Sequence, residues 1–218
     1  TSNKMTTGPD EAFRFWVADR VEKGAKLILS QHGGGYGLLS NLFTEKHELE
    51  ICDKFFSWGW GGGQPKVSPM TSAPWQSIEK NIGSDPNGGI LLVTLSAKLS
   101  FLFIDFVAAG GQVNGPDFIL WKKRFLKFVC PGVSKLLLTR LKWTPTKKFT
   151  CNEKERLKDI CPSLQVYEGE DSMVQQLRRS RLCIHDYFGT SWLETLFMNF
   201  PTVVFWDPNR VHTLTSVQ

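Results

Sequence analysis

The sequence predicts an α/β fold in which helices pack against parallel, doubly wound sheets. From residue 135 onward, short apolar segments alternate with helical ones at the close spacing of βα units. Nearer the N-terminus, a helix, an apolar strand and a glycine-rich turn follow one another. A cluster of turn-forming residues at Ser84–Gly89 separates these two regions. We therefore expect two lobes, residues 1–83 and residues 84–218.

The composition is that of a folded protein that does not cross a membrane. The 218 residues are 41% hydrophobic and 22% charged, and the formal net charge is +5. The longest apolar stretch, residues 90–109, is interrupted by Lys98 and Asp105, so no membrane-spanning helix is expected. We expect a cytoplasmic location. The positive charge favours anionic partners, but the chain contains no recognisable nucleic-acid reader motif, and no nucleic-acid partner is expected.

The cysteines argue against a metal or redox centre. They are odd in number and widely spaced, with no Cys-x-x-Cys pair: Cys52, Cys130, Cys151, Cys161 and Cys183. The sequence predicts reduced, mostly buried thiols, no bound metal and no cofactor.

The first lobe begins with a predicted helix over Pro9–Lys23. Phe13, Trp16, Val17 and Val21 share one helical face, and Gly24 follows the helix.

A strand is predicted next, at Ala25–Ser30, and it runs directly into the glycine-rich turn Gln31–Gly37. A helix over Leu39–Glu50 and a strand over Lys54–Trp60 follow, and Gly61–Pro69 has the composition of a loop. Strand, turn and helix in this order form one βα unit.

The second lobe is predicted to begin with a strand at Ile90–Leu95. Later segments alternate between strand and helix: strand Lys135–Leu141, helix Asn152–Ile160, strand Leu164–Glu168, helix Ser172–Ser180, strand Leu182–Asp186, helix Thr190–Asn199 and strand Thr202–Trp206. Ligands of such a sheet gather at the carboxyl ends of its strands.

That rule selects the segment after the strand that ends at His185. Thr190 and Ser191 are predicted to cap the following helix and, with its free N–H groups, to form a phosphate site. Glu194 lies one turn further on, where a carboxylate can accept two hydrogen bonds from a ribose diol. The alternative interpretation is an ordinary helix cap.

Arg140 is predicted to lie at the end of a strand and to point toward the same edge, where a guanidinium binds phosphate. The alternative is a surface arginine paired with Glu153. His185 and Asp186, at the end of another strand, are further candidates for contact with the donor, and a satisfied structural histidine is the alternative for His185.

His32 is the candidate general base or acid. It lies in the glycine-rich turn, where the glycines leave room for a substrate, and imidazole is the side-chain group most often used for proton transfer in catalysis. Gln31, Gly33 and Gly34 are possible further contacts. A structural loop histidine is the alternative interpretation.

Basic and aromatic residues alternate along a predicted helix at Ile119–Val129. This pattern is typical of a helix that docks on an anionic membrane surface, and also of a solvated helix with one buried stripe. The segment Trp143–Phe149 extends the same pattern.

Several blocks together resemble the transferases of O-antigen and surface-polysaccharide loci. The blocks are Ile28–Gly37, Phe56–Trp60, Leu137–Arg140, Arg181–Tyr187, Thr190–Glu194 and Phe200–Trp206. The last two are also similar to the donor-domain signature of GT-B enzymes.

The resemblance implies a GT-B glycosyltransferase with Rossmann-like lobes. Residues 1–83 would be part of the N-terminal acceptor and catalytic lobe, and residues 84–218 the C-terminal nucleotide-sugar lobe. It implies donor contacts at Thr190, Ser191 and Glu194, a phosphate contact at Arg140 and a catalytic role for His32. Members of the family are longer, so the resemblance also implies an incomplete chain.

The expected reaction transfers a sugar from a nucleotide-sugar donor to a glycan or lipid-linked glycan of the cell surface. The chain has no Asp-x-Asp pair to hold a divalent ion on a diphosphate, which favours a metal-independent enzyme. Two alternatives stay open: a polyol-phosphate transferase that uses CMP- or CDP-linked donors, and a non-catalytic scaffold lobe. Peripheral contact with the inner face of the membrane is a further possibility.

Overall fold

The computed structural model describes residues 10–61, 63–72, 75–95, 115–142, 152–209 and 211–214. These residues form two compact units. The first contains residues 10–78 together with residues 211–214, and the second contains the described residues from Glu79 to Asn209. The chain therefore enters the second unit a few residues before the predicted junction at Ser84. The roles assigned to the two lobes from the sequence stay predictions.

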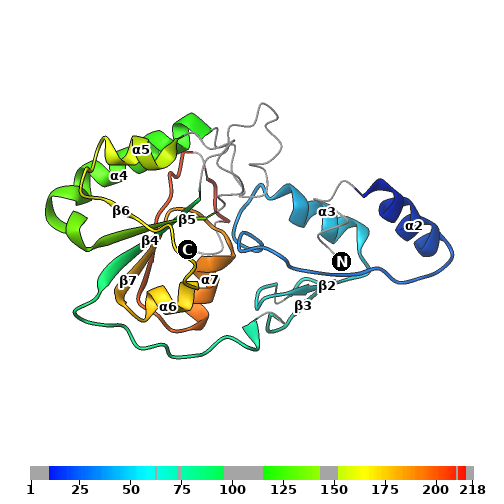
Figure 1. The fold of residues 1–218 in the computed structure, drawn as a ribbon. Coiled ribbons are helices and arrows are strands. Elements are labelled where there is room, and N and C mark those ends of the chain that lie inside the picture. The colour runs from blue at the N-terminus through cyan, green and yellow to red at the C-terminus, as the bar shows by residue number, and fades with distance from the viewer. Residues whose placement is uncertain are drawn as a thin grey trace. The chain divides into compact units, whose positions relative to one another are not determined.

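The first unit is built on a small parallel sheet. Strands β1 (Ile28–Ser30), β2 (Lys54–Ser57) and β3 (Val67–Pro69) pair in that order. Helix α2 (Glu11–Glu22) precedes β1, and helix α3 (Phe43–Ile51) connects β1 to β2 (Figure 1). The crossover between parallel strands through a helix is the βα unit that the sequence predicts.

Helix α2 buries little of its apolar face. The helix itself is confirmed, and Asp10 caps it by accepting a hydrogen bond from the Phe13 N–H at 3.0 Å. Val17 is its only buried residue. Trp16 and Val21, which share the apolar face with Val17, are 54% and 38% exposed. Spacing predicts which residues share a face, but it does not predict whether another element covers that face.

The second unit contains a five-stranded, all-parallel sheet. Its strands are β4 (Gly89–Leu95), β5 (Leu137–Lys142), β6 (Gln165–Val166), β7 (Ser180–His185) and β8 (Thr202–Val204). They lie in the order β6-β5-β4-β7-β8. The chain thus moves outward from β4 to β6 and then returns to the other side of β4. This order places a topological switch point between β4 and β7, where Rossmann-like folds bind their ligands.

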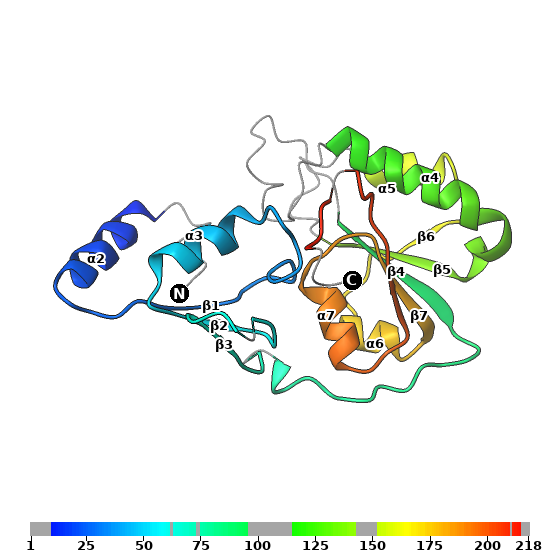
Figure 2. The same ribbon diagram turned by 180° about the vertical axis from the view of Figure 1, so that it is seen from behind.

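Helices cover both faces of this sheet. Helices α4 (Gly115–Val133) and α5 (Glu153–Lys158) lie on one face, with the 3₁₀ turn η3 (Ser134–Leu136) after α4. Helices α6 (Met173–Leu177) and α7 (Thr190–Phe197) lie on the other (Figures 1 and 2). The prediction of an α/β fold with parallel sheets is confirmed.

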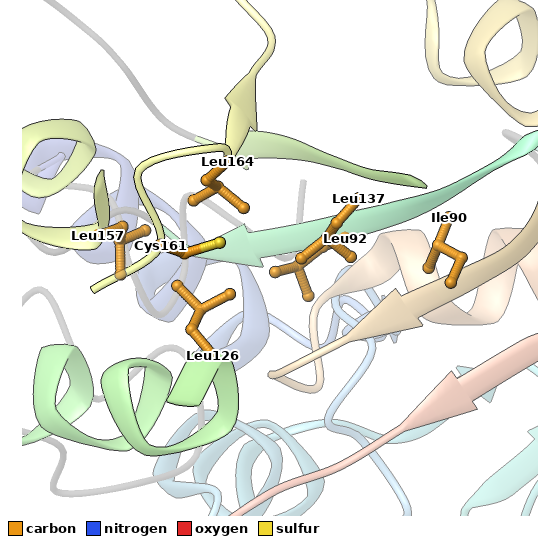
Figure 3. Packing of buried hydrophobic residues seen from close by; sticks show 7 residues of the cluster. All are labelled: Ile90, Leu92, Leu126, Leu137, Leu157, Cys161 and Leu164. Atoms are coloured by element: carbon orange, nitrogen blue, oxygen red, sulfur yellow. The ribbon is translucent and has the colours of Figure 1, made fainter. Parts of the chain in front are cut away.

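A hydrophobic core joins the sheet to α4 and α5 (Figure 3). Its buried members are Ile90, Leu92, Leu126, Leu137, Leu157, Cys161 and Leu164. Ile90 and Leu92 alternate with residues of the opposite face, as they must in a strand that is covered on both sides. Burying side chains of this size contributes about 1.5–3 kcal/mol each, and this core holds β4 and β5 against α4 and α5.

The structure confirms one further prediction and corrects another. Cys52, Cys161 and Cys183 are reduced and buried, as predicted. Strand β3 was missed, because three residues within a stretch rich in glycine and proline carry almost no periodic signal. Within the described ranges, no helix is both long enough and apolar enough to span a bilayer.

Candidate functional site

In the first unit, His32 is held by a buried carboxylate. The Nε2 atom of His32 lies 3.0 Å from Oε1 of Glu48, which is fully buried on α3. Where Glu48 is ionised it can only accept hydrogen bonds, and Nε2 then carries the hydrogen. In that tautomer the lone pair of the ring is on Nδ1, and Nδ1 makes no hydrogen bond within the part of the chain that the structure describes.

Tyr36 completes this cluster. Its hydroxyl donates to Oε2 of Glu48 at 3.0 Å and lies 2.7 Å from Nε2 of His32. Burial, followed by the charge of Glu48, raises the pKa of Tyr36 well above its ordinary value, so the phenol keeps its proton. Glu48 thus receives hydrogen bonds on both oxygens, and the imidazole is oriented as in catalytic triads, where a third group positions the base.

One position of the glycine-rich turn, residue 37, requires glycine. Gly37 has a φ of +70°, and a Cβ atom there would lie 2.5 Å from the ring of Trp60. Its N–H donates to Oε2 of Glu45 at 2.7 Å, and burial raises the pKa of that carboxyl group. The turn is therefore anchored to α3 through Glu45, next to the contact between His32 and Glu48.

The side chain of Gln31 makes hydrogen bonds within the first unit. Its Oε1 accepts hydrogen bonds from the N–H of Trp58 and from the indole of Trp60, and its Nε2 donates to the carbonyl of Gly33. These bonds tie the end of β1 to the loop after β2. Gly33 is half-buried and Gly34 is buried. The contacts that were predicted between these residues and a substrate stay predictions.

In the second unit, the start of α7 differs from the prediction. The N-cap is Gly189 and makes no side-chain cap hydrogen bond, so the prediction that Thr190 and Ser191 cap the helix is wrong. Thr190 is the first helical residue and is half-buried. The hydroxyl of Ser191 is buried and lies 3.2 Å from that of Tyr187. The backbone N–H groups in the first turn of α7 are still the groups here that are best suited to bind an anion.

Glu194 lies one turn into α7 and is half-buried. Within the described residues, its carboxylate makes no hydrogen bond or ion pair. A carboxylate in that position is free to accept hydrogen bonds from a ligand.

Arg140 lies within β5, two residues before its end, and not at the end of the strand as the sequence suggested. Its Nη1 donates to the carbonyl of Asp171 at 3.0 Å and to Oε1 of Gln176 at 2.8 Å. Its guanidinium also lies over the ring of Tyr167, with Cζ 5.7 Å from the ring centroid. The predicted alternative of an Arg140–Glu153 pair is wrong, because Glu153 pairs with Lys122. Nη2 and Nε of Arg140 have no partner among the described residues.

His185 and Arg140 lie on the same face of the sheet. Both are in register with Val93 on the strand between them. His185 is fully buried, with Nε2 3.3 Å from the Thr195 hydroxyl on α7 and 3.3 Å from Sγ of Cys183. The side chain of His185 is therefore packed between β7 and α7.

Asp186 lies on the opposite face, at the switch point itself. Its Oδ2 accepts a hydrogen bond from the hydroxyl of Thr94, at the end of β4. Burial raises the pKa of Asp186 to about 6, against the lowering effect of the Lys122 charge. Lys122 donates to Glu153 and to the carbonyl of Leu95. Ionisable groups with shifted pKa values are common at functional sites.

The structure therefore groups the predicted residues into separate sets. His32 and Gln31 belong to the first unit, whereas Arg140, His185, Asp186, Thr190, Ser191 and Glu194 belong to the second. Sequence reasoning missed Glu48, Tyr36 and Lys122. The available signal was weak: Glu48 follows Thr44 by four residues, which places two polar residues on the buried face of α3.

In the described parts of the chain, no three His, Cys, Asp or Glu side chains are grouped so that they could hold a metal ion.

Comparison with known proteins identifies a family. The model of the LIC12162 family transferases matches residues 4–217. None of the curated proteins matches the chain. Because the match covers nearly the whole sequence and the fold is a parallel α/β fold, the chain belongs to the LIC12162 family of transferases.

Proposed function

We propose that this transferase is a metal-independent glycosyltransferase of the GT-B type, which moves a sugar from a nucleotide-sugar donor to a growing cell-surface polysaccharide. The observation that carries the proposal is the contact between His32 and Glu48. A buried carboxylate holds Nε2, and the second ring nitrogen has no partner in the described residues. An imidazole arranged in this way is suited to act as a general base.

The proposed step is a substitution at the anomeric carbon of the donor sugar. Nδ1 of His32 removes the proton of an acceptor hydroxyl while the hydroxyl oxygen forms a bond to that carbon. The bond from the same carbon to the phosphate oxygen breaks, and its electron pair leaves with the nucleotide. Glu48 stabilises the imidazolium that results, because it accepts the hydrogen bond from Nε2.

The donor is proposed to bind in the second unit, at the carboxyl edge of the five-stranded sheet. The first turn of α7, from Gly189 to Ser191, offers free N–H groups and the positive end of the helix to the phosphates. The nitrogens Nη2 and Nε of Arg140, which have no partner among the described residues, supply further donors. Glu194 is proposed to accept the hydroxyls of the ribose. Together these groups would stabilise the charge that develops on the leaving phosphate.

The acceptor is proposed to be a glycan or lipid-linked glycan of O-antigen or capsule type, and the location to be the cytoplasm. A polyol-phosphate transferase with a CDP-linked donor would use the same phosphate contacts and the same base. A non-catalytic scaffold would need neither the phosphate contacts nor the base. The nature of the released products separates these three possibilities.

The test is calorimetry of the purified chain with UDP, GDP, CDP and CMP, followed by product analysis with the matching sugar-linked donors. We expect one nucleotide to bind and to be released when its sugar is transferred. Glu194→Gln should weaken binding of that ribonucleotide about tenfold or more, the scale of a charged hydrogen bond, and should abolish discrimination against its 2′-deoxy form. Glu170→Gln, an exposed acid of the same unit, is the matched control.

Release of CMP with transfer of glycerol phosphate would replace the sugar with a polyol phosphate. Absence of binding by all four nucleotides would leave a scaffold.

A further inference from the structure

Helix α4 presents an apolar and basic face to solvent. Leu120 and Phe128, which are 53% and 87% exposed, lie on this face two turns apart, and Leu136 in η3 is 39% exposed. The opposite face of α4 is buried through Ile119, Lys122 and Leu126. The exposed apolar residues are therefore not part of the core of the second unit. We call Leu120, Phe128 and the cations along this segment the α4 face.

The cations of the α4 face are Lys123, Arg124, Lys127 and Lys135. Arg124, Lys127 and Lys135 are exposed, and Lys123 is partly exposed. None of the four forms an ion pair or a hydrogen bond with another residue in the described ranges. The sequence from Leu120 to Leu136 contains no Asp or Glu, so the local charge is entirely positive.

Helix α2 provides a contrast within the same chain. It also exposes large apolar side chains, Phe15 at 77% and Trp16 at 54%. Its cations, however, are paired with acids of the same helix, as in the Lys23–Asp19 contact at 2.6 Å. Exposed apolar residues alone therefore do not distinguish α4. The distinguishing feature is that they occur among cations that have no ion pair with any residue the structure describes.

We propose that the α4 face docks on an anionic lipid bilayer. The side chains of Leu120 and Phe128 would enter the boundary between headgroups and acyl chains, and the lysines and arginine would contact the lipid phosphates. A helix lying in the membrane plane needs both features on one side, and the α4 face has both. This inference is independent of the transfer reaction, because it uses no residue of the proposed donor site or of the His32 cluster.

The test is co-sedimentation of the full chain with vesicles of phosphatidylcholine alone and of phosphatidylcholine mixed with phosphatidylglycerol. The chain should bind the mixed vesicles, and salt should weaken that binding. Phe128→Glu should reduce the affinity about tenfold or more. Arg124→Ala combined with Lys127→Ala should reduce it roughly 30-fold, since each cation near the surface contributes about fivefold. Phe15→Glu on α2 is the matched control and should bind as the wild type does.

Because the substituted side chains are exposed, the variants should keep the melting temperature of the wild type. Equal binding to neutral and mixed vesicles, or full binding by Phe128→Glu, would overturn the proposal. Absence of binding by the wild type would overturn it as well. Loss of RNA binding by the Arg124/Lys127 variant with unchanged vesicle binding would assign the face to nucleic acid instead.

Discussion

The Nε2 atom of His32 and the Oε1 atom of Glu48 lie 3.0 Å apart, although their residues belong to a loop and to a helix. The carboxylate is fully buried, while the imidazole remains partly open to solvent, with 22% of its side chain exposed. The buried partner thus fixes the orientation of the ring, and the ring keeps access to a reactant.

Glu48→Gln should lower turnover about 100-fold or more, the scale of general acid–base catalysis, because the amide no longer stabilises the imidazolium. Nucleotide affinity should stay unchanged, and the pH dependence of turnover should shift, which a purely structural role would not cause. Steady-state kinetics across a pH series checks this. Glu50→Gln, an exposed acid on the same helix, is the control. Loss of nucleotide binding together with an unchanged pH profile would remove Glu48 from the mechanism.

Arg140→Ala should weaken nucleotide binding by about 1–3 kcal/mol, because a charged donor to phosphate is lost. The same change leaves Oε1 of Gln176 and the carbonyl of Asp171 without their donor, so the free energy of unfolding should also fall by about 1–3 kcal/mol. Calorimetry and urea unfolding measure the two effects separately. Arg156→Ala, at an exposed position on α5, should change neither. Lower stability with full nucleotide affinity would make Arg140 a structural residue only.

Asp186 should make the stability of the protein depend on pH. Burial raises the pKa of Asp186 from 3.8 to about 6. Between about pH 4 and pH 6 the folded chain therefore binds more protons than the unfolded chain, and the free energy of unfolding falls as the pH rises through this window. Above it, the ionised buried carboxylate costs on the order of 3 kcal/mol.

Asp186→Asn should remove this dependence, because an amide stays neutral at every pH in the window. The difference in unfolding free energy between the variant and the wild type should grow in favour of the variant from pH 4 to pH 6. Urea unfolding at a series of pH values measures it, and Asp159→Asn at an exposed position is the control. If the unfolding free energies of the wild type and of Asp186→Asn changed with pH in parallel, the raised pKa of Asp186 would be contradicted.

Gly37→Ala should destabilise the first unit through both backbone strain and a clash. The residue has a φ of +70°, and the new methyl group would lie 2.5 Å from the ring of Trp60. Gly59→Ala is the matched control, since Gly59 also has a positive φ but has open space where its Cβ would lie. We expect about 1 kcal/mol of destabilisation at Gly59 from strain alone, and about 1–3 kcal/mol more at Gly37. Equal losses in thermal or urea unfolding would mean that the Trp60 ring moves aside freely.

The sequence predicted the order of the elements well and the partners of the side chains poorly. The segments that became β4, β5 and β7 carry continuous apolar runs, which are typical of strands buried on both faces. The contact between His32 and Glu48 is different, because it depends on how α3 packs over the turn after β1. Nothing in the local sequence specifies that geometry.

The start of α7 illustrates the same limit. Thr190 and Ser191 are favoured capping residues, yet both lie inside the helix and Gly189 is the N-cap. The hydroxyl of Ser191 then turns inward to Tyr187. Capping preference predicts that a helix begins in this region, but tertiary packing decides which residue caps it.

The most direct test of the central claim compares turnover and nucleotide affinity in His32→Ala. If His32 is the general base of a transferase, this variant should lose about 100-fold or more of its turnover and should bind the nucleotide as the wild type does. Normal turnover by His32→Ala, or a loss of nucleotide binding that accounts for the whole effect, would contradict the proposed mechanism.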